Sequence, residues 1–224
     1  MASFAQHVNT AVIISGIAIA PLYSSSLIDI NQALALLFFG MMGGILPDID
    51  LENSKPIQIT SSILSIFIPL LAILTLLQSL SISKMLFIWF LSSILLHFIL
   101  FKILLNFTTH RGVIHSIPMG LVFAQFLNIF FSHILEFEEL FSLLCGLFLF
   151  FGFVIHLLLD ELVSLNAFGM SFKKSLGSAL KLYDKNNLFG SILLYITVIV
   201  LQLAYPINIE YIITIYHSLE NINI

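Results

Sequence analysis

Charged residues are scarce in this chain of 224 residues. It has only 8 lysines and arginines and 12 aspartates and glutamates, which together make up 9% of the sequence. Charged residues make up roughly a quarter of a soluble globular domain. The composition therefore excludes an ordinary soluble domain, and we expect no nucleic-acid partner.

Cysteine is nearly absent as well. The single Cys145 excludes a disulfide framework and a metal site built from thiolates. The N-terminus also lacks a basic segment before its first apolar run, so residues 1–20 do not resemble a cleaved signal peptide. We therefore expect His7 to stay in the protein.

Long apolar runs fill most of the chain. Hydrophobic residues make up 59% of the sequence, and the mean hydropathy is +1.10. Because a membrane-spanning helix needs about 20 apolar residues, the sequence predicts an all-α, polytopic transmembrane helix bundle of about seven spans in a single integral membrane domain, residues 1–224. The predicted spans are residues 8–22, 28–46, 56–80, 84–105, 113–134, 140–160 and 188–205.

Four short polar islands interrupt these runs, near residue 7 and at residues 47–54, 110–116 and 156–164. They carry four histidines and three aspartates, residue types that bind divalent metal ions. The candidate metal ligands are His7, Asp48, Asp50, His110, His115, His156 and Asp160.

The predicted topology brings the islands to one side of the membrane. If every span crosses the membrane once, four segments lie on the same side. They are the chain before span one, the connections after spans two and six, and the start of span five. Most basic residues lie in segments on that side, whereas Lys84 lies on the other. By the positive-inside rule, the metal site faces the cytoplasm. We expect an integral membrane protein.

The spacing within the islands suits metal-assisted hydrolysis. His156 and Asp160 are four residues apart, so a helix places them on one face. Seven ligands exceed the needs of one tetrahedral zinc ion. We therefore expect one or two divalent ions, preferably zinc with manganese or magnesium as alternatives, to activate water for attack on an ester or phosphoester. Asp50 and His115 are expected to act in catalysis as well as in metal binding.

Arg111 is the third expected catalytic residue, because its planar guanidinium suits an anionic substrate group. Ser116, Ser54 and Glu161 are candidates for orienting the ligands. Each residue alone also has a structural interpretation, such as an interfacial anchor for Arg111. His97, His133 and His217 lack acidic or histidine neighbours at ligand spacing, so we interpret them as structural.

A basic segment at residues 171–185 differs from the rest of the chain. Its four lysines lie largely off a face formed by Phe172, Leu176, Leu180 and Tyr183. This pattern predicts an amphipathic helix lying in the membrane interface. A solvated loop helix that packs on the site is the alternative.

Together the motifs LPDID, HRG-x-x-HS and H-x-x-x-D, preceded by an N-terminal histidine, resemble the YdjM-type family of membrane-bound, LexA-regulated predicted metal-dependent hydrolases. The resemblance covers the chain from His7 to about Lys181. It implies an integral protein of a prokaryotic cytoplasmic (inner) membrane. It implies that Ser116 and the residues proposed above as ligands, together with Arg111, belong to the site. The chain departs from the family pattern at Ile114 and at residues 163–169, which lie outside the ligand set.

These observations favour a membrane-embedded metal-dependent hydrolase that acts on a phospholipid or another lipid ester, with membrane lipids as its surroundings. The alternative is a non-catalytic membrane protein with a structural metal site or a lipid-remodelling role. A transporter is disfavoured because its ionisable residues would lie near the bilayer midplane, whereas these lie at the ends of the predicted spans.

Overall fold

A computed structural model describes residues 3–50, 61–63, 65–70, 73, 81–107, 112–164 and 180–220, and it describes the side chains of all of these except residues 49, 50, 100–107 and 164. Every regular element in these ranges is helical. The chain divides into two compact units. The first consists of residues 1–47 and 111–224, and the second of residues 48–110.

Two helices begin the first unit, and both start at a capping box. Helix α1 (Phe4–Ser24) begins after Ser3, whose side chain and backbone exchange hydrogen bonds with Gln6. Helix α2 (Ile30–Gly43) begins after Asp29, which does the same with Gln32. Each box satisfies amide groups that the first turn of a helix leaves without partners. Helix α1 therefore starts before His7, which we had expected to precede the first span.

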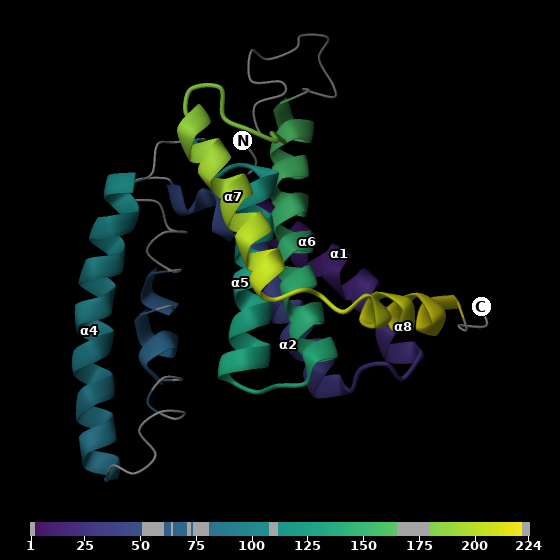
Figure 1. The fold of residues 1–224 in the computed structure, drawn as a ribbon, viewed down its shortest axis with the longest axis horizontal. Helices are drawn as coiled ribbons and strands as arrows, with labels where there is room; N and C mark the ends of the chain where they lie inside the picture. Colours follow the sequence, from purple (N-terminus) through teal and green to yellow (C-terminus); the bar gives the residue numbers. More distant parts are fainter. Residues whose placement is uncertain are drawn as a thin grey trace. The chain divides into compact units, whose positions relative to one another are not determined.

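The rest of the first unit follows the predicted spans closely. Helix α5 (Ile117–Ile129) continues into a π-helical turn, η2 (Phe130–Ile134). Helix α6 (Glu139–Ser164) follows, and then α7 (Leu188–Ala204) and α8 (Ile209–Glu220). Helix α8 bends away from α7 by 90° (Figure 1). The sequence had given no sign of α8, because its asparagine-rich flanks obscure a 12-residue helix.

Helix α6 is the centre of the first unit, where it packs against α1, α2 and α5 (Figure 1). Glycines allow the closest of these approaches. A Cβ atom on Gly152 would collide with the backbone carbonyl of Gly40, and one on Gly43 would collide with that of Leu149. Close contact through small residues is the usual means of helix association in a membrane, where lipid offers as apolar a surrounding as leucine.

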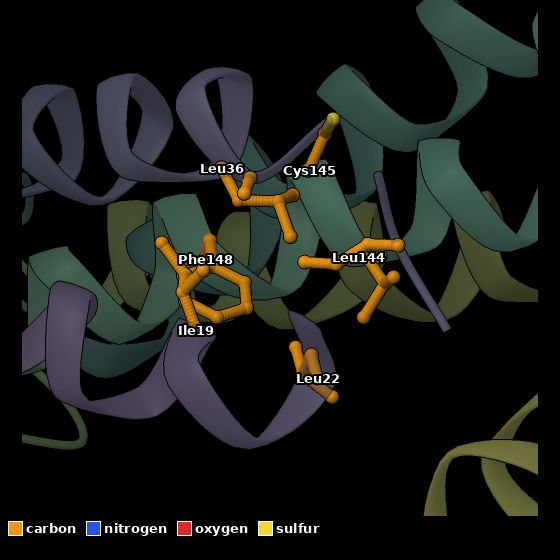
Figure 2. Packing of buried hydrophobic residues seen from close by; sticks show 8 residues of the cluster. Ile19, Leu22, Leu36, Leu144, Cys145 and Phe148 are labelled. Atoms are coloured by element: carbon orange, nitrogen blue, oxygen red, sulfur yellow. The ribbon is translucent and has the colours of Figure 1, made fainter. Parts of the chain in front are cut away.

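An apolar cluster fills the space between α1, α2 and α6 toward the Glu139 end of α6. Figure 2 shows side chains from these three helices facing one another, with Cys145 among them. Cys145 is fully buried and has no disulfide partner, as its apolar neighbours in the sequence predict. The labelled members are Ile19, Leu22, Leu36, Leu144, Cys145 and Phe148.

The lengths and composition of the helices confirm an all-helical membrane protein. Five described helices are long and apolar enough to cross a membrane, and a sixth span is possible if the bent pair α7 and α8 is one. Large apolar side chains such as Phe189 (79% exposed) and Leu203 (77% exposed) cover the outside of α7, as expected for a surface that contacts lipid. The predicted number of seven spans is not confirmed, because most of residues 56–80 lie outside the described ranges.

The first predicted span ends later than its proline suggested. Pro21 lies inside α1, which continues to Ser24. The hydroxyls of Ser24 and Ser25 donate to the carbonyls of Pro21 and Leu22. These bonds stabilise the last turn by adding donors for carbonyls near the end of the helix.

The second unit contains α4 (Ile82–Phe107), close to the predicted span at residues 84–105. His97 of this helix lies with its Nδ1 atom 3.4 Å from the Ser65 hydroxyl. The unit begins with the latter part of a short 3₁₀ helix, η1 (Leu46–Asp50), which crosses the unit boundary at Pro47.

The predicted interfacial helix at residues 171–185 falls partly outside the described residues, which resume at Leu180. From there to Asn187 the chain forms bends and turns. The helix prediction is therefore wrong for residues 180–185. Polar contacts explain the difference, since Lys181 forms an ion pair with Asp184 at 3.6 Å, and Asp184 accepts a hydrogen bond from the Asn186 amide.

Candidate metal centre

Helix α6 contributes His156 and Asp160 to a buried polar cluster near its C-terminal end. Both side chains are fully buried. The spacing of four residues places them one turn apart on the same face, as the sequence predicted. A carboxylate in such surroundings is unfavourable unless it is paired or bound to an ion.

His7 of α1 meets these two residues. Its Nε2 atom lies 3.3 Å from Oδ1 of Asp160. Its ring stacks on the ring of His156, with centroids 3.7 Å apart and planes inclined by 12°. Residues that are about 150 positions apart in the sequence are thus brought into direct contact, because α1 and α6 pack side by side.

The C-terminal end of α2 orients the His156 ring. Nδ1 of His156 lies 2.8 Å from the backbone carbonyl oxygen of Gly44. A carbonyl oxygen only accepts hydrogen bonds, so Nδ1 carries the proton and donates it. In the neutral ring Nε2 then keeps its lone pair, the form in which a histidine binds a metal. The sequence did not predict this role of Gly44, because residue types do not show which side chain a backbone carbonyl contacts.

His115 approaches from the turn that precedes α5. Its amide donates to the Gly112 carbonyl at 3.2 Å, which closes the turn that the glycine suggested. The side chain is fully buried, and its ring packs edge-on against His156 with centroids 5.7 Å apart. The Ser116 hydroxyl donates to the Val113 carbonyl at 2.6 Å, so its observed contact stabilises this turn.

The chain around Lys181 supports the same turn. The amide of Ile117, the first residue of α5, donates to the Lys181 carbonyl at 3.0 Å. The nearby Asp184 is buried, and its amide donates to the Ser191 hydroxyl at 2.9 Å. The chain from Leu180 to Asn187 therefore helps to fix the turn that carries His115.

The geometry at His7, His156 and Asp160 suits a metal ion. Each residue offers one ligand atom, and the three atoms lie within 4.8 Å of one another. Two imidazoles and one carboxylate form the ligand set of several catalytic zinc sites, which leave a fourth position for water or substrate. The Gly44 carbonyl supplies the outer hydrogen bond that such sites need.

Several of the remaining candidate residues are not described by the structure. His110, Arg111 and Ser54 lie outside the described residues, as does the side chain of Asp50. Asp48 is buried at the start of the second unit. The assignments of these residues, and the number of ions, remain predictions.

No protein-family model matches this chain, and neither a curated protein nor a solved structure is similar to it. The resemblance to the YdjM-type family therefore remains a prediction from the motifs.

Proposed function

We propose that this chain is a membrane-embedded, metal-dependent hydrolase whose divalent ion is held by His7, His156 and Asp160. The observation that carries the proposal is the convergence of three buried ligand atoms from α1 and α6. The hydrogen bond from His156 to Gly44 supports it, because it directs Nε2 toward an ion and not toward the backbone.

The nature of the ligands favours zinc, with manganese or magnesium as alternatives. Imidazole nitrogen suits zinc, whereas magnesium prefers a site of oxygen atoms only. A bound zinc ion supplies a Lewis acid and allows water to attack an ester or phosphoester near neutral pH. The chain itself supplies the ligands, excludes bulk water by burial, and places the His115 ring beside His156 as a candidate proton carrier.

The position of the site favours a lipid substrate. His7 is the fourth residue of α1, and Asp160 lies four residues before the end of α6. At 1.5 Å per residue, both side chains lie within roughly 6 Å of a helix end. Ester and phosphoester groups of lipids occupy that level of a membrane, whereas a transporter site is expected near the midplane.

Arg111 completes the proposal as the group that contacts an anionic part of the substrate. It directly precedes the turn that carries His115, and its guanidinium cannot bind a metal. The predicted charge distribution favours the cytoplasmic side of the membrane for this end of the bundle. The motifs that resemble the YdjM-type family agree with this proposal.

Metal analysis of the purified full chain tests the proposal. We expect about one to two divalent ions per chain, and a loss of most of this metal in His156→Ala and in His7→Ala. His97→Ala is the matched control, since it removes a histidine from the second unit and should leave the metal content unchanged. Equal loss from His97→Ala and His156→Ala would show that the ligands are wrongly assigned.

Activity measurements separate an enzyme from a structural metal site. Hydrolysis of bis(p-nitrophenyl) phosphate and of phosphatidylglycerol vesicles is measured on the same preparations. We expect metal-dependent turnover that disappears with His156→Ala. Stoichiometric metal without turnover of either substrate class would instead favour the non-catalytic alternative.

A further inference from the structure

A second polar site lies at the other end of α6. A pocket of about 150 Å³ is formed by the end of α5 and η2, the start of α6, the connection between α7 and α8, and α8 itself. Glu139 lines it as the first residue of α6. Since Glu139 and His156 are 17 residues apart, roughly 25 Å of helix separates this pocket from the metal centre.

The π-helical turn η2 brings His133 to the pocket wall. The Ser132 hydroxyl donates its proton to the Asn128 carbonyl at 2.8 Å, and it lies 2.6 Å from Nδ1 of His133. Because the hydroxyl has only one proton, Nδ1 must donate to it. The His133 ring then packs edge-to-face with Tyr205, with centroids 4.7 Å apart. Turns of this kind often occur at functional sites.

Glu139 gives the pocket its charge. It accepts a hydrogen bond from the Tyr211 hydroxyl at 2.8 Å. This bond, together with the charges of Glu139, Glu210 and Glu138, raises the pKa of Tyr211 above its ordinary value of 10.0. Within the described part of the chain, no lysine, arginine or histidine forms an ion pair with Glu139. The pocket therefore combines a negative potential with the rings of Tyr205 and Tyr211.

We propose that this pocket binds an organic ammonium group. Tyrosine rings and a carboxylate are the groups that attract quaternary and primary ammonium ions in proteins. A volume of about 150 Å³ is below the roughly 300 Å³ at which drug-sized pockets begin, so the pocket takes a headgroup and not a whole lipid. Either the headgroup of a membrane lipid or a free amine supplies this chemistry.

The position of the pocket helps to decide between a lipid headgroup and a free amine as the source of the ammonium group. Glu139 begins a helix of 26 residues, which spans roughly 39 Å at 1.5 Å per residue. A hydrocarbon core is about 30 Å thick, so this end of α6 extends to the level of lipid headgroups. The site is independent of the proposed hydrolase, because no residue is shared with the metal centre.

Choline is the first probe, and its binding to the full chain in maltoside detergent is measured by calorimetry. We expect saturable binding to the wild type. Glu139→Gln should weaken it about fivefold, equivalent to about 1 kcal/mol for one favourable contact with the cation. Tyr205→Leu should weaken it by a similar factor. Glu138→Gln is the matched control, since it also removes one exposed carboxylate next to α6 but does not line the pocket.

A second arm identifies the source of the ammonium group. Native mass spectrometry compares lipids retained from nanodiscs of phosphatidylcholine and of phosphatidylglycerol. Preferential retention of phosphatidylcholine that Glu139→Gln abolishes identifies a lipid headgroup, whereas choline binding without lipid preference identifies a free amine. The proposal is overturned if neither choline nor phosphatidylcholine binds, or if Glu138→Gln weakens binding as much as Glu139→Gln. Unchanged thermal unfolding of each variant shows that the fold is intact.

Discussion

The two ends of α6 hold polar side chains in different surroundings. Near Asp160, imidazoles and a carboxylate are fully buried, and Gly152 allows α2 to approach α6 about two turns before Asp160. Near Glu139, the polar side chains are exposed or half-buried, and the end of α5 widens into the π-helical turn η2. Close packing therefore accompanies the end at which ligand geometry must be fixed, and an open pocket accompanies the other.

Burial also changes what each polar contact contributes. At the Asp160 end, removing one partner leaves the others without compensation in a dry interior, a loss that costs several times more than the same change at a surface. At the Glu139 end, water replaces what is lost, and ion pairs contribute little. The same chemical substitution is thus expected to have unequal effects at the two ends.

The largest predicted difference is the side of the membrane that each end faces. In a background of Cys145→Ala, single cysteines replace Lys185, near the metal centre, and Glu138, near the pocket. We expect a membrane-impermeant maleimide to label position 138 in intact cells and position 185 only after lysis. Equal labelling of the two positions in intact cells would contradict both the single crossing by α6 and the proposed orientation.

Neutralising one carboxylate at each end is the second comparison. Asp160→Asn removes a proposed ligand and should lower metal affinity by more than about 100-fold, the upper range for loss of an outer-shell partner. Glu139→Gln should leave metal affinity unchanged and alter stability by no more than about 0.5 kcal/mol. Isothermal titration with zinc on chelator-treated protein measures the affinities. A similar loss in both variants would mean that the two ends are coupled.

Adding one methyl group tests the role of close packing. Gly152→Ala places a Cβ against the Gly40 carbonyl and should destabilise the protein by about 2 kcal/mol through overpacking. Gly16→Ala adds the same group where only Leu37 Cδ1 lies within reach, at 3.9 Å. It should be neutral or stabilising by up to about 1 kcal/mol. Unfolding in sodium dodecyl sulfate, followed by circular dichroism, compares them, and equal destabilisation would show that the approach of α2 to α6 is not limited by Gly152.

The sequence predicted helix positions well because a membrane imposes one requirement on every span, a long apolar run. The bounds of α4 and α7 differ from their predictions by at most two residues at each end. The helix predicted through Lys185 failed because apolar periodicity does not report the local hydrogen bonds of Asp184. The predicted end of the first span was too early for a related reason, since nearby serines stabilise the turn that contains Pro21.

The candidate site could be predicted in part. The spacing of His156 and Asp160 fixes their common face, and the topology brings His7 to the same end, so residue types and order were sufficient for these three. The Gly44 carbonyl and the support from Lys181 involve backbone atoms, which no residue pattern specifies. His133 was interpreted as structural because the residues that line the pocket with it come from other elements, Tyr205 from the connection after α7 and Glu139 from the start of α6.

The smallest predicted effect concerns Tyr211 at the open end. Its raised pKa means that the hydrogen bond to Glu139 contributes stability below the pKa of the unfolded chain. That contribution is lost as the pH rises through the higher pKa of the folded state.

Ultraviolet absorbance measures the ionisation of tyrosine side chains as the pH is raised. We expect one tyrosine to ionise at a higher pH than the others, and Tyr211→Phe should remove this component. Glu139→Gln should shift this component furthest toward its ordinary value, because the hydrogen bond is the main cause of the raised pKa. Glu138→Gln should shift it least, because the charge of Glu138 is the smallest of the causes. A titration curve that Tyr211→Phe leaves unchanged in its late part would show that Glu139 does not hold this phenol, and the negative potential assigned to the pocket would lose its support.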